Sequence, residues 1–151
     1  MATQGLTQHP ESPDLHNAYG LLLAAEDKVP EALEETEKAL ALRSTFLDAQ
    51  INRAILLKRL GRYPDSIAQF QAVLNANPAN LKARANLGGT LLLAKRYEEA
   101  AAALREAVTQ APDDFDLHAN LGLALQKSGH AAEAQKEFAL AEKLRGPEKK
   151  Q

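Results

Sequence analysis

Apolar residues recur along the chain three or four positions apart, the spacing of one face of a helix. Superimposed on this pattern is a longer interval, because small residues return every 34 positions. Two such series are predicted contact points between helices: Gly20, Ala54, Gly88 and Gly122 in the first, and Ala32, Ser66, Ala100 and Ala134 in the second. A fixed interval of this length is typical of repeat proteins.

The interval divides the chain into four repeats without insertion or deletion, at residues 13–46, 47–80, 81–114 and 115–147. Each repeat is interrupted near its middle by breaker or charged residues, as at Gly61 and Arg62, with helical spacing on either side. Pro78 and Pro112 mark ends of repeats, because proline cannot continue a helix. We therefore predict an all-α chain in which every repeat is a pair of antiparallel helices.

This arrangement resembles the tetratricopeptide repeat family over essentially the whole chain. The family places small residues at positions 8, 20 and 27 of each repeat, which the chain matches with few exceptions, and large residues between them, such as Leu57, Leu91 and Tyr63. The resemblance implies an α-solenoid that winds as a right-handed superhelix. Arg53 departs from the family pattern, so the resemblance does not predict how the residues around it pack.

Composition narrows the possible partners. The net charge of −2 provides no basic field for nucleic acid, and no apolar run reaches the length of a membrane span. There is no cysteine, which excludes disulfides and thiolate chemistry. We expect no nucleic-acid partner, no membrane partner and no cofactor, and a cytoplasmic location.

Both ends of the chain carry repeat-like features. Residues 1–12 continue the pattern backward as the remnant of a preceding repeat, which predicts that the chain is the C-terminal part of a longer repeat protein. In the last repeat, Gln135 and Glu142 stand where the earlier repeats have apolar residues, so its second helix is predicted to be a polar cap, followed by a charged tail at 148–151.

The resemblance also implies a binding surface, because in this family the first helices line a concave groove that holds an extended peptide or a helix of another protein. Asn52, Asn86 and Asn120 occupy one repeat position there, and each amide can donate to and accept from a peptide backbone. The alternative is that these amides are solvated or bonded locally. Apolar contacts are predicted at Leu21, Ile55 and Leu123, with a notch at Gly89.

Basic residues on the same predicted surface favour acidic residues in the ligand. They are Lys58, Arg59, Lys82 and Lys127. Alternatively, these long side chains simply lie along a solvated face.

No set of catalytic or metal-binding residues converges in the sequence. His16 and His118 share a repeat position but lie three repeats apart, and no phosphate-binding loop or nucleophile motif is present. The preferred interpretation is a noncatalytic interaction scaffold. Two others remain open: a regulatory or substrate-docking region of a larger enzyme, and a self-assembly module that uses either the N-terminal face of the chain or the apolar surface of Leu92 and Leu93.

Overall fold

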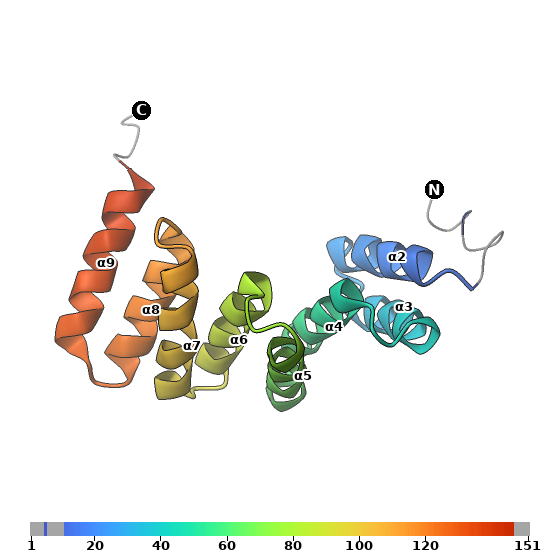
Figure 1. The fold of residues 1–151 in the computed structure, drawn as a ribbon, viewed down its shortest axis with the longest axis horizontal. Helices are drawn as coiled ribbons and strands as arrows, with labels where there is room; N and C mark the ends of the chain where they lie inside the picture. The colour runs from blue at the N-terminus through green and yellow to red at the C-terminus, as the bar shows by residue number, and fades with distance from the viewer. Residues whose placement is uncertain (1–4, 6–10, 147–151) are drawn as a thin grey trace. The chain divides into compact units, whose positions relative to one another are not determined.

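The computed structural model describes residue 5 and residues 11–146, and this part of the chain contains helices and no strand (Figure 1). The predicted all-α class is confirmed. The predicted tail at 148–151 and most of the predicted remnant at 1–12 lie outside the described residues. The helices are α2 (Pro13–Ala25), α3 (Val29–Leu42), α4 (Leu47–Arg59), α5 (Tyr63–Ala76), α6 (Leu81–Leu93), α7 (Tyr97–Gln110), α8 (Phe115–Lys127) and α9 (Ala131–Arg145).

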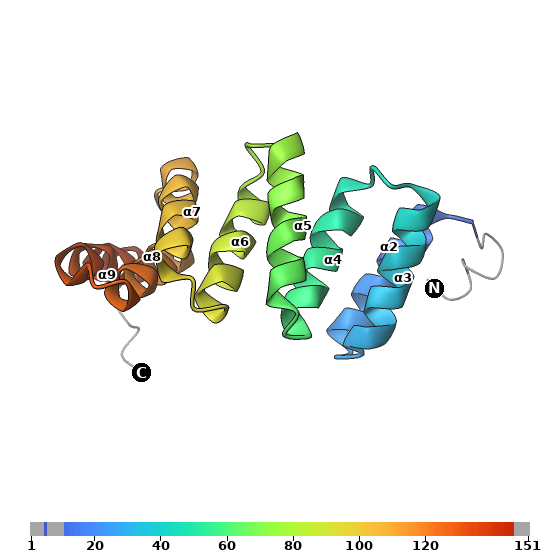
Figure 2. The same ribbon diagram turned by 90° about the horizontal axis from the view of Figure 1, so that it is seen from below.

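The chain divides into two compact units, with the division between Pro78 and Ala79. In unit one, α2 packs against α3 and α4 against α5, while α3 also contacts α4. In unit two, α6 packs against α7 and α8 against α9, while α7 also contacts α8 (Figure 2). Helices that are consecutive in the sequence therefore pack against each other within each unit, as short connections between helices favour.

Glycines in the first helix of a pair allow the second helix to approach closely. A Cβ atom added at Gly88 would lie 2.5 Å from Cγ of Leu104 in α7, and one at Gly122 would lie 2.7 Å from the Phe138 ring in α9. These distances are too short for a contact between two carbon atoms that are not bonded to each other. At Gly20, the third glycine of the first series, a Cβ atom would lie 2.9 Å from Oγ1 of Thr36, so helix contacts require a small residue at all three glycines.

Ser66 uses its hydroxyl to join two helices. It stands where other repeats have alanine, and its hydroxyl donates to the Ala54 carbonyl oxygen of α4 across 2.7 Å. Both residues are fully buried. A hydroxyl is therefore tolerated in this tight contact because its hydrogen bond is satisfied.

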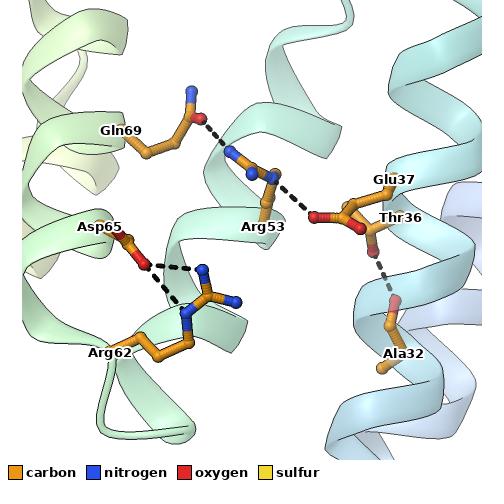
Figure 3. Close-up of polar contacts among 7 residues, drawn as sticks. All are labelled: Ala32, Thr36, Glu37, Arg53, Arg62, Asp65 and Gln69. Atoms are coloured by element: carbon orange, nitrogen blue, oxygen red, sulfur yellow. Dashed lines mark hydrogen bonds and ion pairs between the residues drawn. The ribbon is translucent and has the colours of Figure 1, made fainter.

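Arg53 is accommodated by polar partners on both neighbouring helices (Figure 3). Its Nε donates to Glu37 of α3 at 3.2 Å, and its Nη1 donates to Gln69 of α5 at 2.8 Å. The guanidinium stays about one-third exposed. The departure from the family pattern thus creates a polar bridge across three helices of unit one.

The loop within each helix pair contains one residue in the left-handed backbone region. The four residues are 34 positions apart: Asp27 with φ of 62°, Gly61 with 74°, Lys95 with 60° and Gly129 with 88°. Glycine adopts this conformation without penalty, whereas a lysine does not. The loop geometry is therefore kept even where the sequence does not favour it.

The second helix of the last predicted repeat, α9, is polar on only part of its surface. Gln135 and Glu142 are exposed, as expected for a polar cap. Leu140 and Leu144, one turn apart on the same helix, are exposed as well. Apolar surface thus remains on α9 beside its polar residues.

Candidate functional site

Two asparagine side chains on neighbouring first helices of unit one are bonded to each other. Nδ2 of Asn52, in the second turn of α4, donates to Oδ1 of Asn17 in α2 across 3.0 Å. The two residues are 7% and 8% exposed, respectively. An amide pair so little exposed to solvent is held in one orientation, because rotating either amide would break its hydrogen bond.

One donor and one acceptor of this pair reach the surface. Among the described residues, Nδ2 of Asn17 and Oδ1 of Asn52 have no hydrogen-bond partner. Neither is a buried orphan, because every fully buried side-chain polar atom of the described residues is bonded. The pair therefore has one N–H donor group and one carbonyl acceptor that are not used by the described residues.

Apolar side chains adjoin the amide pair on the same helices. Leu21 follows Asn17 by one turn of α2 and is 50% exposed, and Ile55 follows Asn52 by three residues in α4 and is half-buried. Residues three or four apart lie on the same face of a helix. The surface over α2 and α4 thus combines two hydrogen-bonding groups with apolar contact area.

The other two predicted asparagines lie in unit two and behave differently. Nδ2 of Asn86 donates to the Lys82 carbonyl of its own helix at 2.9 Å, and Asn120 is half-buried. The residue of α6 that is repeat-equivalent to Asn17 is Ala85, so Asn120 has no amide there to pair with. The three predicted groove asparagines therefore have three different environments.

Asn17 is the residue that the groove prediction omitted. The sequence signal for it is an asparagine at position 5 of one repeat with an asparagine at position 6 of the next, a combination found at Asn17 and Asn52. Helices that stack side by side bring these two positions together, as the contact between α2 and α4 shows.

The predicted basic residues differ in their surroundings. Arg59 donates to the Ala24 carbonyl at 2.9 Å and to Asp27 at 2.8 Å, closing the end of α2. Lys58 is half-buried, and this burial lowers the pKa of its ammonium. Lys82 and Lys127 are exposed.

Gly89 and Leu123, predicted to line the groove of unit two, are both accessible. A Cβ atom added at Gly89 would have no neighbour within 4 Å, so the space beside it is open. Leu123 is among the exposed large apolar residues. Helix packing thus does not require glycine at 89, in contrast with Gly88.

The two histidines at the shared repeat position each bond to a glutamate. Nδ1 of His16 lies 2.6 Å from Glu35, and Nδ1 of His118 lies 2.6 Å from Glu137. In the described part of the chain, no three histidine or acidic side chains come together as a metal site would require. The histidines therefore join the two helices of a pair.

In the described residues no helix combines the length and the apolar character needed to cross a membrane. The longest helix that the structure describes, α9, has 15 residues.

The fold is that of an α-helical repeat protein built from antiparallel helix pairs. Family models described as tetratricopeptide repeat match residues 51–115 and residues 91–146. The chain belongs to the tetratricopeptide repeat family.

Solved structures with this fold include MamA from Desulfovibrio magneticus RS-1, with a TM-score of 0.88 and 22% sequence identity over 95% of this chain and 81% of that one. A crystal structure of MamA aligns with a TM-score of 0.86 and 19% identity over 95% of this chain and 84% of the other. At such identities the likeness shows the fold alone. No curated protein matches the sequence.

Proposed function

We propose that this chain is a noncatalytic interaction scaffold that holds an extended segment of a partner protein on the surface over α2 and α4. The observation that carries the proposal is the bonded pair of Asn17 and Asn52, which exposes one donor and one acceptor. Membership of a repeat family that builds extended binding surfaces supports it.

The exposed groups of the pair complement one residue of an extended peptide. In an extended chain the N–H and C=O of the same residue point to the same side and can bond one partner together. Such a residue would donate to Oδ1 of Asn52 and accept from Nδ2 of Asn17. Because both amides are fixed by their mutual bond, little side-chain entropy is lost on binding.

The apolar residues add a place for the peptide's side chains. One helical turn is about 5.4 Å, so Leu21 lies roughly two extended residues from Asn17 along the direction of α2. An apolar side chain two positions from the gripped residue would therefore reach Leu21 or Ile55. The proposed ligand is an extended segment with one apolar residue spaced in this way.

Peptide ligands can be selected from a display library of random sequences, with the full chain as the immobilised target. A selected peptide should bind about 5- to 150-fold more weakly to a variant with Asn17→Ala and Asn52→Ala, since two hydrogen bonds are lost and each is worth about 0.5–1.5 kcal/mol. Asn120→Ala is the matched control, because it removes the same group from a first helix of unit two.

Peptides methylated at single backbone nitrogens test whether the grip is on the backbone. One position should be sensitive in the native chain and insensitive in the double alanine variant. Equal affinity of the native and double-variant chains, with both folded by circular dichroism, would remove the α2 and α4 surface as the binding site.

A further inference from the structure

Unit two has an open pocket where the loop between α6 and α7 meets the end of α8. Its volume is about 390 Å³, and its lining includes Lys95, Arg96, Glu98, Glu99 and Lys127. This pocket lies wholly in unit two, whereas the peptide surface proposed above lies in unit one. The two sites can therefore be tested separately.

The equivalent place in unit one is closed by an ion pair. Lys95 and Lys127 are the repeat equivalents of Asp27 and Arg59, each two 34-residue intervals further along the chain. In unit one the Arg59 guanidinium donates to the Asp27 carboxylate at 2.8 Å and to the Ala24 carbonyl. A side chain of the last turn of α4 is thus bonded to the loop between α2 and α3.

In unit two both members of this pair are cations, so the same closure cannot form. Among the described residues, neither Lys95 nor Lys127 has an ion-pair or hydrogen-bond partner through its side chain. The third cation of the lining, Arg96, is already bonded to Glu99 at 2.6 Å. Two ammonium groups from different elements therefore adjoin one pocket, whose lining holds three cations against the two carboxylates of Glu98 and Glu99 and so has one net positive charge.

We propose that this pocket binds the carboxylate of an acidic side chain from a partner protein, in the role that the Asp27 carboxylate has in unit one. A carboxylate between the two lysines supplies the missing negative charge and restores the link between loop and helix. Glu98 and Glu99 reduce the lining to one net positive charge, which a single carboxylate balances and a phosphate dianion exceeds. The site is therefore matched to a carboxylate rather than to a phosphate dianion.

The test is a nuclear magnetic resonance titration of the full chain with the capped tripeptide acetyl-Gly-Glu-Gly-amide. We expect the changes in backbone amide chemical shift to be concentrated in residues 95–99 and 127–128, and we expect no such changes with acetyl-Gly-Gln-Gly-amide. Lys127→Gln should weaken binding by about 1.5- to 5-fold, the size of one exposed ion pair. Low salt is used, because ions screen exposed charges.

A charge-reversal variant provides the internal comparison. Lys95→Asp recreates the order of charges in unit one, so it should fill the pocket with an intramolecular carboxylate and abolish the localised shifts. Lys136→Asp, on an exposed site of α9, makes the same change in net charge and should leave the localised shifts in place.

Three results would overturn the proposal. The first is equal binding of the glutamine peptide, and the second is an equal loss of binding in the Lys136 variant. The third is tighter binding of inorganic phosphate than of the glutamate peptide. None of these results bears on peptide binding over α2 and α4, which is measured with the Asn17 and Asn52 variants.

Discussion

The imidazole of His118 donates from Nδ1 to the carboxylate of Glu137 across 2.6 Å, and its Nε2 lies 2.8 Å from the Pro112 carbonyl oxygen. Both ring nitrogens therefore face acceptors, and both can donate only when the ring is protonated. The side chain is 5% exposed. Unit two thus provides an acceptor for each ring nitrogen of His118, an arrangement that favours the protonated ring.

Protonation of His118 should make stability depend on pH. Burial alone lowers the pKa of His118, but the hydrogen bonds to Glu137 and Pro112 and the nearby Asp114 charge outweigh it, so the pKa is raised above its ordinary value of 6.5. The native chain then binds this proton more tightly than the unfolded chain. The resulting stability is fully present below pH 6.5 and is lost as the pH rises through the native pKa.

Urea unfolding near pH 6 and near pH 9 measures this effect. Relative to His118→Gln, the native chain should lose part of its free energy of unfolding at the higher pH. At the lower pH, the substitution should cost about 1–3 kcal/mol, because it removes hydrogen bonds made by a charged group. An identical pH dependence in both chains would contradict a protonated His118.

The consecutive glycines of α6 should respond to alanine in opposite directions. Gly88→Ala places a Cβ atom against Leu104 and should destabilise the chain by about 1–3 kcal/mol. Gly89→Ala meets no atom within 4 Å and should stabilise it by about 0.5–1 kcal/mol, because alanine restricts the unfolded chain and favours a helix. Thermal melting of the two single variants provides the comparison, and two shifts of the same sign would be inconsistent with this packing.

Lys95 should be less favourable than glycine at its backbone position. Its φ of 60° is left-handed, as is the φ of 88° at Gly129. Lys95→Gly should therefore raise the free energy of unfolding by roughly 0.5–1 kcal/mol, and Gly129→Ala should lower it by about 1 kcal/mol. Chemical denaturation at constant pH measures both changes, and a loss of stability in Lys95→Gly would show that the lysine side chain outweighs its backbone cost.

Arg53 should contribute modestly and in a salt-dependent way. The ion pair with Glu37 is partly exposed, so a double-mutant cycle with Arg53→Met and Glu37→Gln should give a coupling of about 0.2–1 kcal/mol that shrinks at high salt. Arg62→Met is the control for loss of a single arginine charge, because Arg62 bonds to Asp65, only three residues away in the sequence, and not to another helix pair (Figure 3). Zero coupling at low salt would mean that the Arg53 contact adds nothing measurable.

The pattern of small residues was sufficient to locate the closest helix contacts. Gly88 and Gly122 were predicted to lie at contacts because they recur every 34 positions, and their neighbours in α7 and α9 leave no room for a Cβ atom. The same pattern did not explain Gly89. Its open surroundings show that helix packing is not the reason for a glycine there.

The candidate site was predicted less completely than the fold. Position in the repeat identified Asn52, Leu21 and Ile55, but the partner of Asn52 was not identified, because hydrogen bonding between amides depends on the side chain opposite. Arg59 was predicted as a ligand-binding cation, and the structure bonds it to the end of α2 and to the loop between α2 and α3. Repeat position shows which residues share a face and does not show which of them pair with one another.

The sequence by itself determined that this chain is a series of antiparallel helix pairs, because helix periodicity and repeated small residues are local features that any stacking of the helices must satisfy. Only the tertiary structure decided which polar side chains bond to one another and which remain available to bind a ligand. Asn17 and Asn52 bond to each other, Arg59 is tied to Asp27, and Lys95 and Lys127 have no such partners within the described residues. Pairing of this kind depends on distances between side chains of different helices, which the order of residues along one helix does not specify.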